Sequence, residues 1–171
     1  MESMEDYRIL GIDPGLNITG YGVISVVGNQ LSIVEAGVIR SRRSDDLGVR
    51  LQSLHDGITD VIKTLKPNSV GLEQIFSHYE RVQTAIIMGH ARGVICLACS
   101  QLGLEPENYA ATQIKKVLTG NGRAPKSQVQ LAVTRQLNLN ETPEPPDVAD
   151  ALAIAMCHFF LARPHQRLNS A

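Results

Sequence analysis

Hydrophobic and polar residues alternate along the chain with two different periods, one typical of strands and the other of helices. Three apolar stretches rich in valine and isoleucine come first, at residues 7–13, 20–27 and 30–41. Gly28-Asn29, between the second and third stretches, is a common turn sequence of β-hairpins. Because such short turns join the stretches, we expect three sequential strands in an antiparallel meander.

Helical spacing is the main pattern in the rest of the chain. From Leu47 to Leu65 the apolar residues recur every three or four positions, and Pro67 then stops the pattern. Similar reasoning predicts helices at residues 47–65, 82–102, 112–118, 126–137 and 147–162. Two short strands, at 70–73 and 108–111, lie between helices. Three strands followed by alternating helices and strands are typical of an α/β domain with a mixed sheet.

The length of 171 residues suits a single domain, since domains cluster at roughly 100–150 residues. We expect residues 7–162 to form that domain, with a disordered extension at 1–6 and a flexible tail at 163–171. The longest uncharged apolar run, Ala151 to Cys157, is far shorter than the ~20 residues that span a bilayer. The acidic amino-terminal residues also lack the pattern of a signal peptide. These features predict a soluble cytoplasmic protein without a membrane partner.

Charge is distributed unevenly, although the formal net charge is only −1. No acidic residue lies between Glu107 and Glu141. The same segment carries five basic residues, which are Lys115, Lys116, Arg123, Lys126 and Arg135. Such a local excess of positive charge is typical of a surface that faces a polyanion. From charge alone, a solvated helical face is an equally good interpretation.

Four carboxylates stand at positions that their secondary structure does not explain. Asp13 and Glu73 each end an apolar strand, and a buried carboxylate is costly without a partner. Asp147 and Asp150 are three residues apart at the start of the last helix, so they share a face. Each has an ordinary alternative: Asp13 can start a turn, Glu73 can pair with Arg92 or cap an amide, and the helical acids complement the helix dipole.

All four carboxylates converge if the last helix packs beside the two strand ends. Nearby carboxylates repel and raise each other's pKa, and a divalent cation relieves that repulsion. Hard oxygen ligands suit Mg²⁺ or Mn²⁺, and two such ions about 3.5–4 Å apart form the clamp used by phosphodiester-cleaving enzymes. The pattern therefore predicts a metal site for phosphodiester hydrolysis.

Two glycine-rich segments indicate other ways to bind phosphate. Asp13-Pro14-Gly15 also suits the phosphate-binding hairpin of actin-like ATPases, but those proteins need two such domains to enclose a nucleotide. Residues 120–127 nearly match a P-loop, except that Pro125 replaces its second glycine and has no N–H to offer a phosphate. Arg123 and Lys126 on this loop instead suit contact with a polynucleotide backbone.

Three other features have weaker functional signals. Phe76 follows Glu73 in a polar loop. Its ring either stacks on bases or packs beneath the loop, and the sequence does not decide between these two interpretations. Cys96 and Cys99 form a C-x-x-C inside an apolar helix without a second pair at zinc spacing, so we expect core packing. We expect His158, on the last helix, to be structural.

These segments together resemble the RuvC family of bacterial Holliday junction resolvases from about Arg8 to His158. The motifs that carry the resemblance are, in order, Gly11-Ile12-Asp13-Pro14-Gly15 with Thr19-Gly20-Tyr21-Gly22, Glu73-Gln74-Ile75-Phe76, Gly89-His90-Ala91-Arg92-Gly93-Val94, Tyr109-Ala110-Ala111, Lys126-Ser127-Gln128-Val129 and Asp147-Val148-Ala149-Asp150-Ala151-Leu152-Ala153-Ile154-Ala155. The resemblance implies a ribonuclease H-like fold, with a mixed five-stranded sheet flanked by helices. It also implies a homodimer that makes paired, symmetry-related nicks in four-way DNA junctions.

The resemblance further implies roles for individual residues. The implied catalytic metal ligands are Asp13, Glu73, Asp147 and Asp150. Lys115 and Lys126 match basic residues near the scissile phosphate, and we expect Lys126 to stabilise the developing charge there. Phe76 matches an aromatic residue inserted at the junction centre, and the helix at 82–102 matches the dimer-forming helix. The complete set of expected DNA-contact residues is Phe76, Arg81, Lys115, Lys116, Arg123 and Lys126.

The expected activity is that of a crossover junction endodeoxyribonuclease in homologous recombination and DNA repair, leaving 5′-phosphate and 3′-hydroxyl ends. We expect roughly two Mg²⁺ ions per subunit, with Mn²⁺ able to substitute. The implied partners are four-way junction DNA, a second copy of the chain and the RuvA–RuvB branch-migration complex. Two alternatives stay open: a junction-binding protein without nuclease activity, and an ATPase-like nucleotide-binding domain.

Overall fold

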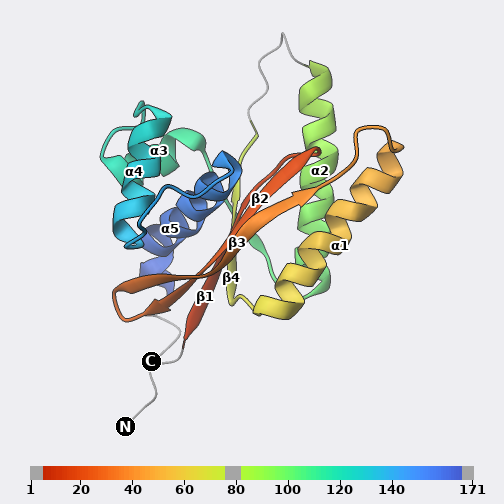
Figure 1. The fold of residues 1–171 in the computed structure, drawn as a ribbon. Helices are drawn as coiled ribbons and strands as arrows, with labels where there is room; N and C mark the ends of the chain where they lie inside the picture. Colours follow the sequence, from red (N-terminus) through yellow and green to blue (C-terminus); the bar gives the residue numbers. More distant parts are fainter. Residues whose placement is uncertain (1–5, 76–81, 167–171) are drawn as a thin grey trace.

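A five-stranded mixed sheet forms the centre of the fold (Figure 1). In the computed structural model, which describes residues 6–75 and 82–166, the strand order is β3-β2-β1-β4-β5. The strands are β1 Tyr7–Asp13, β2 Ile18–Val27, β3 Gln30–Arg40, β4 Ser69–Glu73 and β5 Pro106–Tyr109. The first three are antiparallel, while β4 runs parallel to β1 and β5 runs parallel to β4. The expected meander and mixed sheet are therefore confirmed.

Helices cover both faces of this sheet. Figure 1 shows helices on both sides of it. On one side lie α1 Leu47–Leu65 and α2 Val82–Gln101, and on the other lie α3 Ala111–Thr119, α4 Lys126–Gln136 and α5 Pro146–Gln166. Strand β1 is buried on both faces, because Ile9 belongs to the core beneath α5 while Leu10 and Ile12 belong to the core beneath α1 and α2.

Helix α5 contacts the sheet backbone directly, across a row of glycines. Gly22, Gly11 and Gly71 are lateral neighbours on β2, β1 and β4. A Cβ added at Gly11 would lie 2.0 Å from the carbonyl oxygen of Ala151, and one at Gly22 would lie 2.7 Å from Cδ2 of Leu152. Glycine within a strand is typical of places where another backbone approaches closely. The row therefore allows α5 to sit closer to the sheet than any larger residue would permit.

The predicted elements agree with the structure to within two residues at every end but one. The exception is α5, which continues to Gln166 beyond the predicted end at residue 162. Strand β5 begins at Pro106 rather than at residue 108, and its sequence Pro-Glu-Asn-Tyr has no apolar alternation from which to find it. Because β5 is an edge strand, it tolerates a proline at its first position.

Asp6 is linked by its side chain to the first two strands. Its carboxylate accepts hydrogen bonds from Arg8 Nε, at 2.9 Å, and from the Ser25 hydroxyl on β2. The expected bounds of the domain, residues 7–162, stay a prediction.

His158 is buried at the junction of α5, β4 and β5. Its Nε2 lies 2.9 Å from Ser69 Oγ and its Nδ1 lies 2.8 Å from Tyr109 Oη, which donates to Glu107 Oε2 at 3.0 Å. Because the tyrosine gives its only proton to Glu107, Nδ1 carries the ring proton and Nε2 accepts from Ser69. Burial lowers the pKa of His158, which favours this neutral form. These contacts are structural, as expected.

The two cysteines of the C-x-x-C both contribute to the core beside α1. Cys99 is fully buried, and Cys96 is half-buried and packs against the same cluster. Core packing, the interpretation favoured from the sequence, is therefore the observed role.

The side of α2 that faces away from α1 is apolar and open. Val82, Ile86 and Leu97 are 51%, 55% and 52% exposed, respectively. Gly89 and Gly93 lie on the same side, and a Cβ at either would have no atom within 4 Å. Glycines at such positions let another helix pack closely, but no other element packs against them within the described part of the chain.

Length and composition alone would allow α2 to cross a membrane, and among the described residues it is the one helix of that kind. The uncharged runs of the sequence do not reveal it, because Arg92 interrupts the apolar stretch. The opposite side of α2 is a core face, with Ala91, Ile95, Ala98 and Cys99 fully buried.

We expect Gly11→Ala to destabilise the protein, because the new Cβ would meet the backbone of α5 at Ala151 and Ala155. Backbone atoms cannot move aside as a flexible side chain can, so the helix must shift, at a cost of about 1–3 kcal/mol or more. Urea unfolding followed by circular dichroism measures the change in the free energy of unfolding.

Gly48→Ala is the matched control, since a Cβ at this position in α1 meets only open space. Alanine favours a helix over glycine by about 0.5–1 kcal/mol, so this variant should be as stable as the parent or more stable. Equal stability of both variants would contradict the close contact at Gly11.

Candidate active site

Asp13 and Glu73 lie together because they end two neighbouring parallel strands. Strands β1 and β4 are paired up to Ile12 and Leu72, so the next residue of each is a carboxylate at the same edge of the sheet. Both side chains are half-buried, and their carboxyl groups share a hydrogen bond. The structure thus brings together the first two residues of the predicted site.

The first turns of α5 bring the other two carboxylates to this edge. A Cβ added at Gly20 would lie 2.1 Å from the carbonyl oxygen of Asp147, and Gly20 is the β2 residue paired with Asp13. Asp150, one turn further along, lines a cavity together with Glu73. The negative charges of Asp147 and Asp150 both act on Asp13. The other three predicted carboxylates therefore all lie within electrostatic reach of Asp13.

The pKa of Asp13 shows how strongly these groups interact. Burial, followed by repulsion from Glu73 and Asp150, raises the pKa of Asp13 to about 8. Burial also raises the pKa of Glu73, although the hydrogen bond with Asp13 opposes that rise. The pair formed by Asp13 and Glu73 consequently holds a proton more readily than isolated carboxyl groups do.

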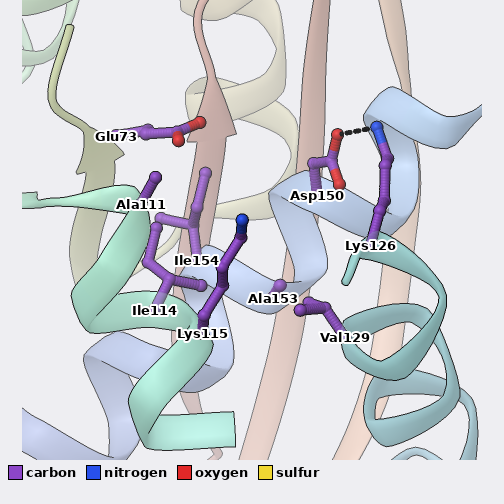
Figure 2. A pocket seen from close by; sticks show the side chains of 9 residues that line it. All are labelled: Glu73, Ala111, Ile114, Lys115, Lys126, Val129, Asp150, Ala153 and Ile154. Carbon is purple, nitrogen blue, oxygen red and sulfur yellow. Dashed lines mark hydrogen bonds and ion pairs between the residues drawn. The ribbon is translucent and has the colours of Figure 1, made fainter. Parts of the chain in front are cut away.

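Two lysines reach the cavity from α3 and α4. Lys126 Nζ lies 2.8 Å from Asp150 Oδ2, and Lys115 points between Glu73 and Asp150 (Figure 2). The hydrogen bond with Asp150 raises the pKa of Lys126, and both lysines lower the pKa of Glu73. The cavity measures about 240 Å³, and its apolar lining is Ala111, Ile114, Val129, Ala153 and Ile154.

The loop after Asp13 is fixed by groups other than the Asp13 side chain. The buried hydroxyl of Thr19 accepts a hydrogen bond from Gly15 N at 3.2 Å and donates to the Gly15 carbonyl. Ser41 at the end of β3 donates to the carbonyl of Leu16. The Asp13 carboxyl is instead directed at Glu73, so the alternative that it serves only to start the turn is not supported.

Arg92 approaches Glu73 in a way that the sequence did not predict. Its Nη1 donates to the backbone carbonyl of Glu73 at 2.8 Å, and its Nη2 donates to Asn108 Oδ1 on β5. The ion pair with the Glu73 carboxylate, left open as an alternative, is not what the structure has. Asn108 gave no sequence signal, because its strand has no hydrophobic pattern.

The other predicted DNA-contact residues fall into two groups. Lys116 and Arg123 are exposed and do not line the cavity. Phe76 and Arg81 lie outside the residues that the structure describes. Residues 120–125 join α3 to α4, which begins at Lys126. A helix and not a strand therefore precedes the P-loop-like sequence, in agreement with the rejection of that motif.

The donor set has the chemistry of a divalent-cation site. Carboxylate oxygens are the ligands that Mg²⁺ and Mn²⁺ prefer. Across residues 6–75 and 82–166, no three Asp, Glu, His or Cys side chains already lie at metal-binding separations. The proton shared by Asp13 and Glu73 and the ammonium of Lys126 neutralise the carboxylates instead. Because a cation would relieve the same repulsion, the residues fit such an ion.

Comparisons with known proteins point to one family. The family model for "Crossover junction endodeoxyribonuclease RuvC" matches residues 9–158. A protein of that name from Rhodopirellula baltica is 60% identical over 154 residues, covering 90% of this chain and 86% of its own. The structure of Thermus thermophilus RuvC matches with a TM-score of 0.86 at 32% identity, covering 92% of this chain and 96% of that chain.

A second solved structure, of Thermus thermophilus RuvC in complex with a Holliday junction substrate, matches with a TM-score of 0.83 at 30% identity. It also covers 92% of this chain and 96% of that chain. The ribonuclease H-like fold expected from the sequence is confirmed by these structures together with the observed sheet.

We expect Asp13→Asn to stabilise the metal-free protein increasingly as pH rises. The pKa of Asp13 is about 8 in the folded state against an ordinary 3.8, so folding binds a proton that the unfolded chain releases. The parent therefore loses stability across this pH interval, whereas asparagine has no proton to lose. Thermal melts in EDTA at several pH values should show a gain of about 0.5–2 kcal/mol at neutral pH.

Asp60→Asn, at an exposed position on α1, is the control and should give no such pH-dependent gain. If the two variants respond to pH alike, the carboxylates do not repel one another as the structure indicates.

Proposed function

This chain belongs to the RuvC family of crossover junction endodeoxyribonucleases, and we infer from that membership that it is a Holliday junction resolvase acting in recombination and repair. Its substrate is four-way junction DNA. The observation that supports this function in the molecule itself is a cavity lined by Glu73, Asp150, Lys115 and Lys126 (Figure 2). Asp13 lies within electrostatic reach of Glu73, Asp150 and Asp147 beside it. Such a set suits the hydrolysis of a phosphodiester, in which negative charge increases at the phosphate.

We propose that Asp13, Glu73, Asp147 and Asp150 hold the metal of this nuclease. Metal dependence follows from family membership, and we propose Mg²⁺, roughly two ions per subunit, with Mn²⁺ able to substitute. When bound, the ions would neutralise charge on the scissile phosphate and lower the pKa of the attacking water. The mutual repulsion that keeps Asp13 protonated supports this assignment, because cations remove it.

Lys126 and Lys115 are proposed to act on the phosphate itself. The Lys126 ammonium is paired with Asp150 at the mouth of the cavity, and its side chain is 57% exposed. It can therefore turn to a non-bridging oxygen and stabilise the charge that develops during in-line attack. Lys115, from α3, lies close enough to Glu73 to contact the same or the adjacent phosphate. The cut would leave a 5′-phosphate and a 3′-hydroxyl.

Other DNA contacts are proposed around this site. Lys116 and Arg123 belong to the α3–α4 region beside the cavity, where phosphate contacts release counterions. Phe76 and Arg81, outside the described residues, remain candidates for contact at the junction centre. The excess of positive charge between Glu107 and Glu141 supports a DNA path along this side.

We propose that two copies of the chain pair through the open side of α2. Its exposed apolar residues flank Gly89 and Gly93, and two glycines four residues apart let a second helix approach closely. A two-fold dimer has two identical sites, which suits a junction that is itself nearly two-fold symmetric. Paired, symmetry-related nicks would then follow from the symmetry of the complex.

The two alternative functions are less well supported. A junction-binding protein without nuclease activity has no need for half-buried, mutually repelling carboxylates, yet all four are present. An actin-like ATPase needs two domains around a nucleotide, and the described residues form one sheet. A cytoplasmic location and contact with the RuvA–RuvB complex are proposals that rest on family membership alone.

We expect Asp150→Asn to lower cleavage of a four-way junction by more than about 100-fold, the loss typical even of residues that only support metal ligands. Junction binding should persist, because the carboxylate repels DNA rather than attracting it. Gels of a synthetic mobile junction beside a linear duplex, in Mg²⁺ and in EDTA, measure cleavage. Fluorescence anisotropy in EDTA measures binding.

The parent should make paired nicks in the junction, only when Mg²⁺ is present, and should not cut the duplex. Asp60→Asn should behave like the parent in both assays. Loss of binding together with cleavage in Asp150→Asn would mean that the carboxylate is structural rather than catalytic.

We expect Ile86→Lys to convert the dimer into monomers, because it places a charge in the centre of the apolar side of α2. Sedimentation analysis measures the oligomeric state, and nicks made in both strands of one junction report paired cutting. Val49→Lys changes a similarly exposed residue on α1 and is the control. If Ile86→Lys stays dimeric while Val49→Lys becomes monomeric, the interface does not lie on the open side of α2.

A further inference from the structure

We propose that Arg92 is a positioning residue that fixes Glu73 to the dimer helix α2. The proposal rests on the function inferred above and adds a residue that is outside the expected catalytic and DNA-contact sets. Arg92 does not line the cavity that Glu73, Asp150, Lys115 and Lys126 share, and its contact is with the Glu73 backbone, so we place it as acting through Glu73.

Glu73 needs such a support because it lies at the very end of its strand. Pairing between β1 and β4 stops at Ile12 and Leu72, which leaves Glu73 with a sheet partner on one side only, at Tyr109 of β5. The next residue, Gln74, donates its N–H to the Tyr109 carbonyl at 2.9 Å. The Glu73 carbonyl is held from the α2 side by Arg92 Nη1 at 2.8 Å.

The guanidinium of Arg92 holds two strand ends at once. One nitrogen donates to Glu73 on β4 and the other donates to Asn108 on β5. Its planar fork can make both hydrogen bonds in one fixed geometry, whereas a lysine ammonium is a flexible point charge. The position of the Glu73 carboxylate therefore depends on where α2 lies relative to β4 and β5.

The location of Arg92 on α2 connects this contact to the open side of the helix. Gly93 is its neighbour in the chain and Gly89 lies almost one turn before it, and both face the proposed partner subunit. Ala91, on its other side, is buried in the core. A displacement of α2 on dimer formation would thus move the donors that hold Glu73.

The test compares Arg92→Lys and Arg92→Met with the parent as full-length dimers. Single-turnover cleavage of the junction should fall by about 100-fold in Arg92→Met, the loss typical of a misplaced catalytic group, and by less in Arg92→Lys. The Mg²⁺ concentration for half-maximal cleavage should rise, and Mn²⁺ binding measured by calorimetry should weaken. Junction affinity, sedimentation and the melting temperature should stay close to those of the parent.

A control variant separates the contact from general effects. Arg40→Gln removes an exposed arginine at the end of β3 and should have no effect on cleavage. A cavity of about 430 Å³ lined by Arg92, Gln74, Ile75, Ala85 and Gly89 gives the substituted side chains room, so neither Arg92 variant overpacks the fold.

A parental cleavage rate and Mg²⁺ dependence in Arg92→Met would overturn the proposal. Equal losses in Arg92→Lys and Arg92→Met, with a lower melting temperature and unchanged Mn²⁺ binding, would also overturn it by showing a purely structural role. Asp150→Asn is assayed alongside. If it is inactive while Arg92→Met is normal, the positioning role alone fails, and if it stays active, the proposed catalytic site fails.

Discussion

The backbone contact between α5 and the sheet is the constraint on which the rest of this structure depends. A helix that packs on a sheet through large side chains has some freedom in height and register. Here the row of Gly22, Gly11 and Gly71 removes that freedom. Atoms of α5 occupy or closely approach the positions that Cβ atoms would take at these glycines. The same approach at Gly20 places Asp147 beside the end of β1. Residues without functional groups thus determine where the carboxylates meet.

The close approach has an electrostatic consequence that opposes folding. It places carboxylates where burial and mutual repulsion raise the pKa of Asp13 to about 8. The protein accommodates this by leaving a proton between Asp13 and Glu73 and an ammonium at Asp150. Active sites commonly store destabilising arrangements of this kind, and stability lost there is recovered in the core. The fully buried, alanine-rich part of α5 behind Asp150 supplies such a core.

The sequence predicted most of the fold because its hydrophobic periods are strong. Strand 7–13 and helix 47–65 agree with the structure at both ends, since a buried strand and a one-sided helix have distinct patterns. Strand β5 was displaced because an edge strand with the sequence Pro-Glu-Asn-Tyr shows no such pattern. The four carboxylates were found as departures from their elements. Arg92 was not assigned to the site, because its contact with the backbone carbonyl of Glu73 leaves no signature in side-chain chemistry. Asn108, which accepts from Arg92, lies in a strand without a hydrophobic pattern.

Helix α2 combines three roles that the sequence pattern does not separate. One side, with Ala91 and Ile95, is part of the core beside α1. Another, with Gly89 and Gly93, is open and is the side proposed to contact a second copy. Arg92 lies between these sides and reaches β4 and β5. In a two-fold dimer built on α2, the spacing of the two sites and the placement of each Glu73 would depend on the same helix. The geometry that matches a junction and the geometry that cuts it would then be set together.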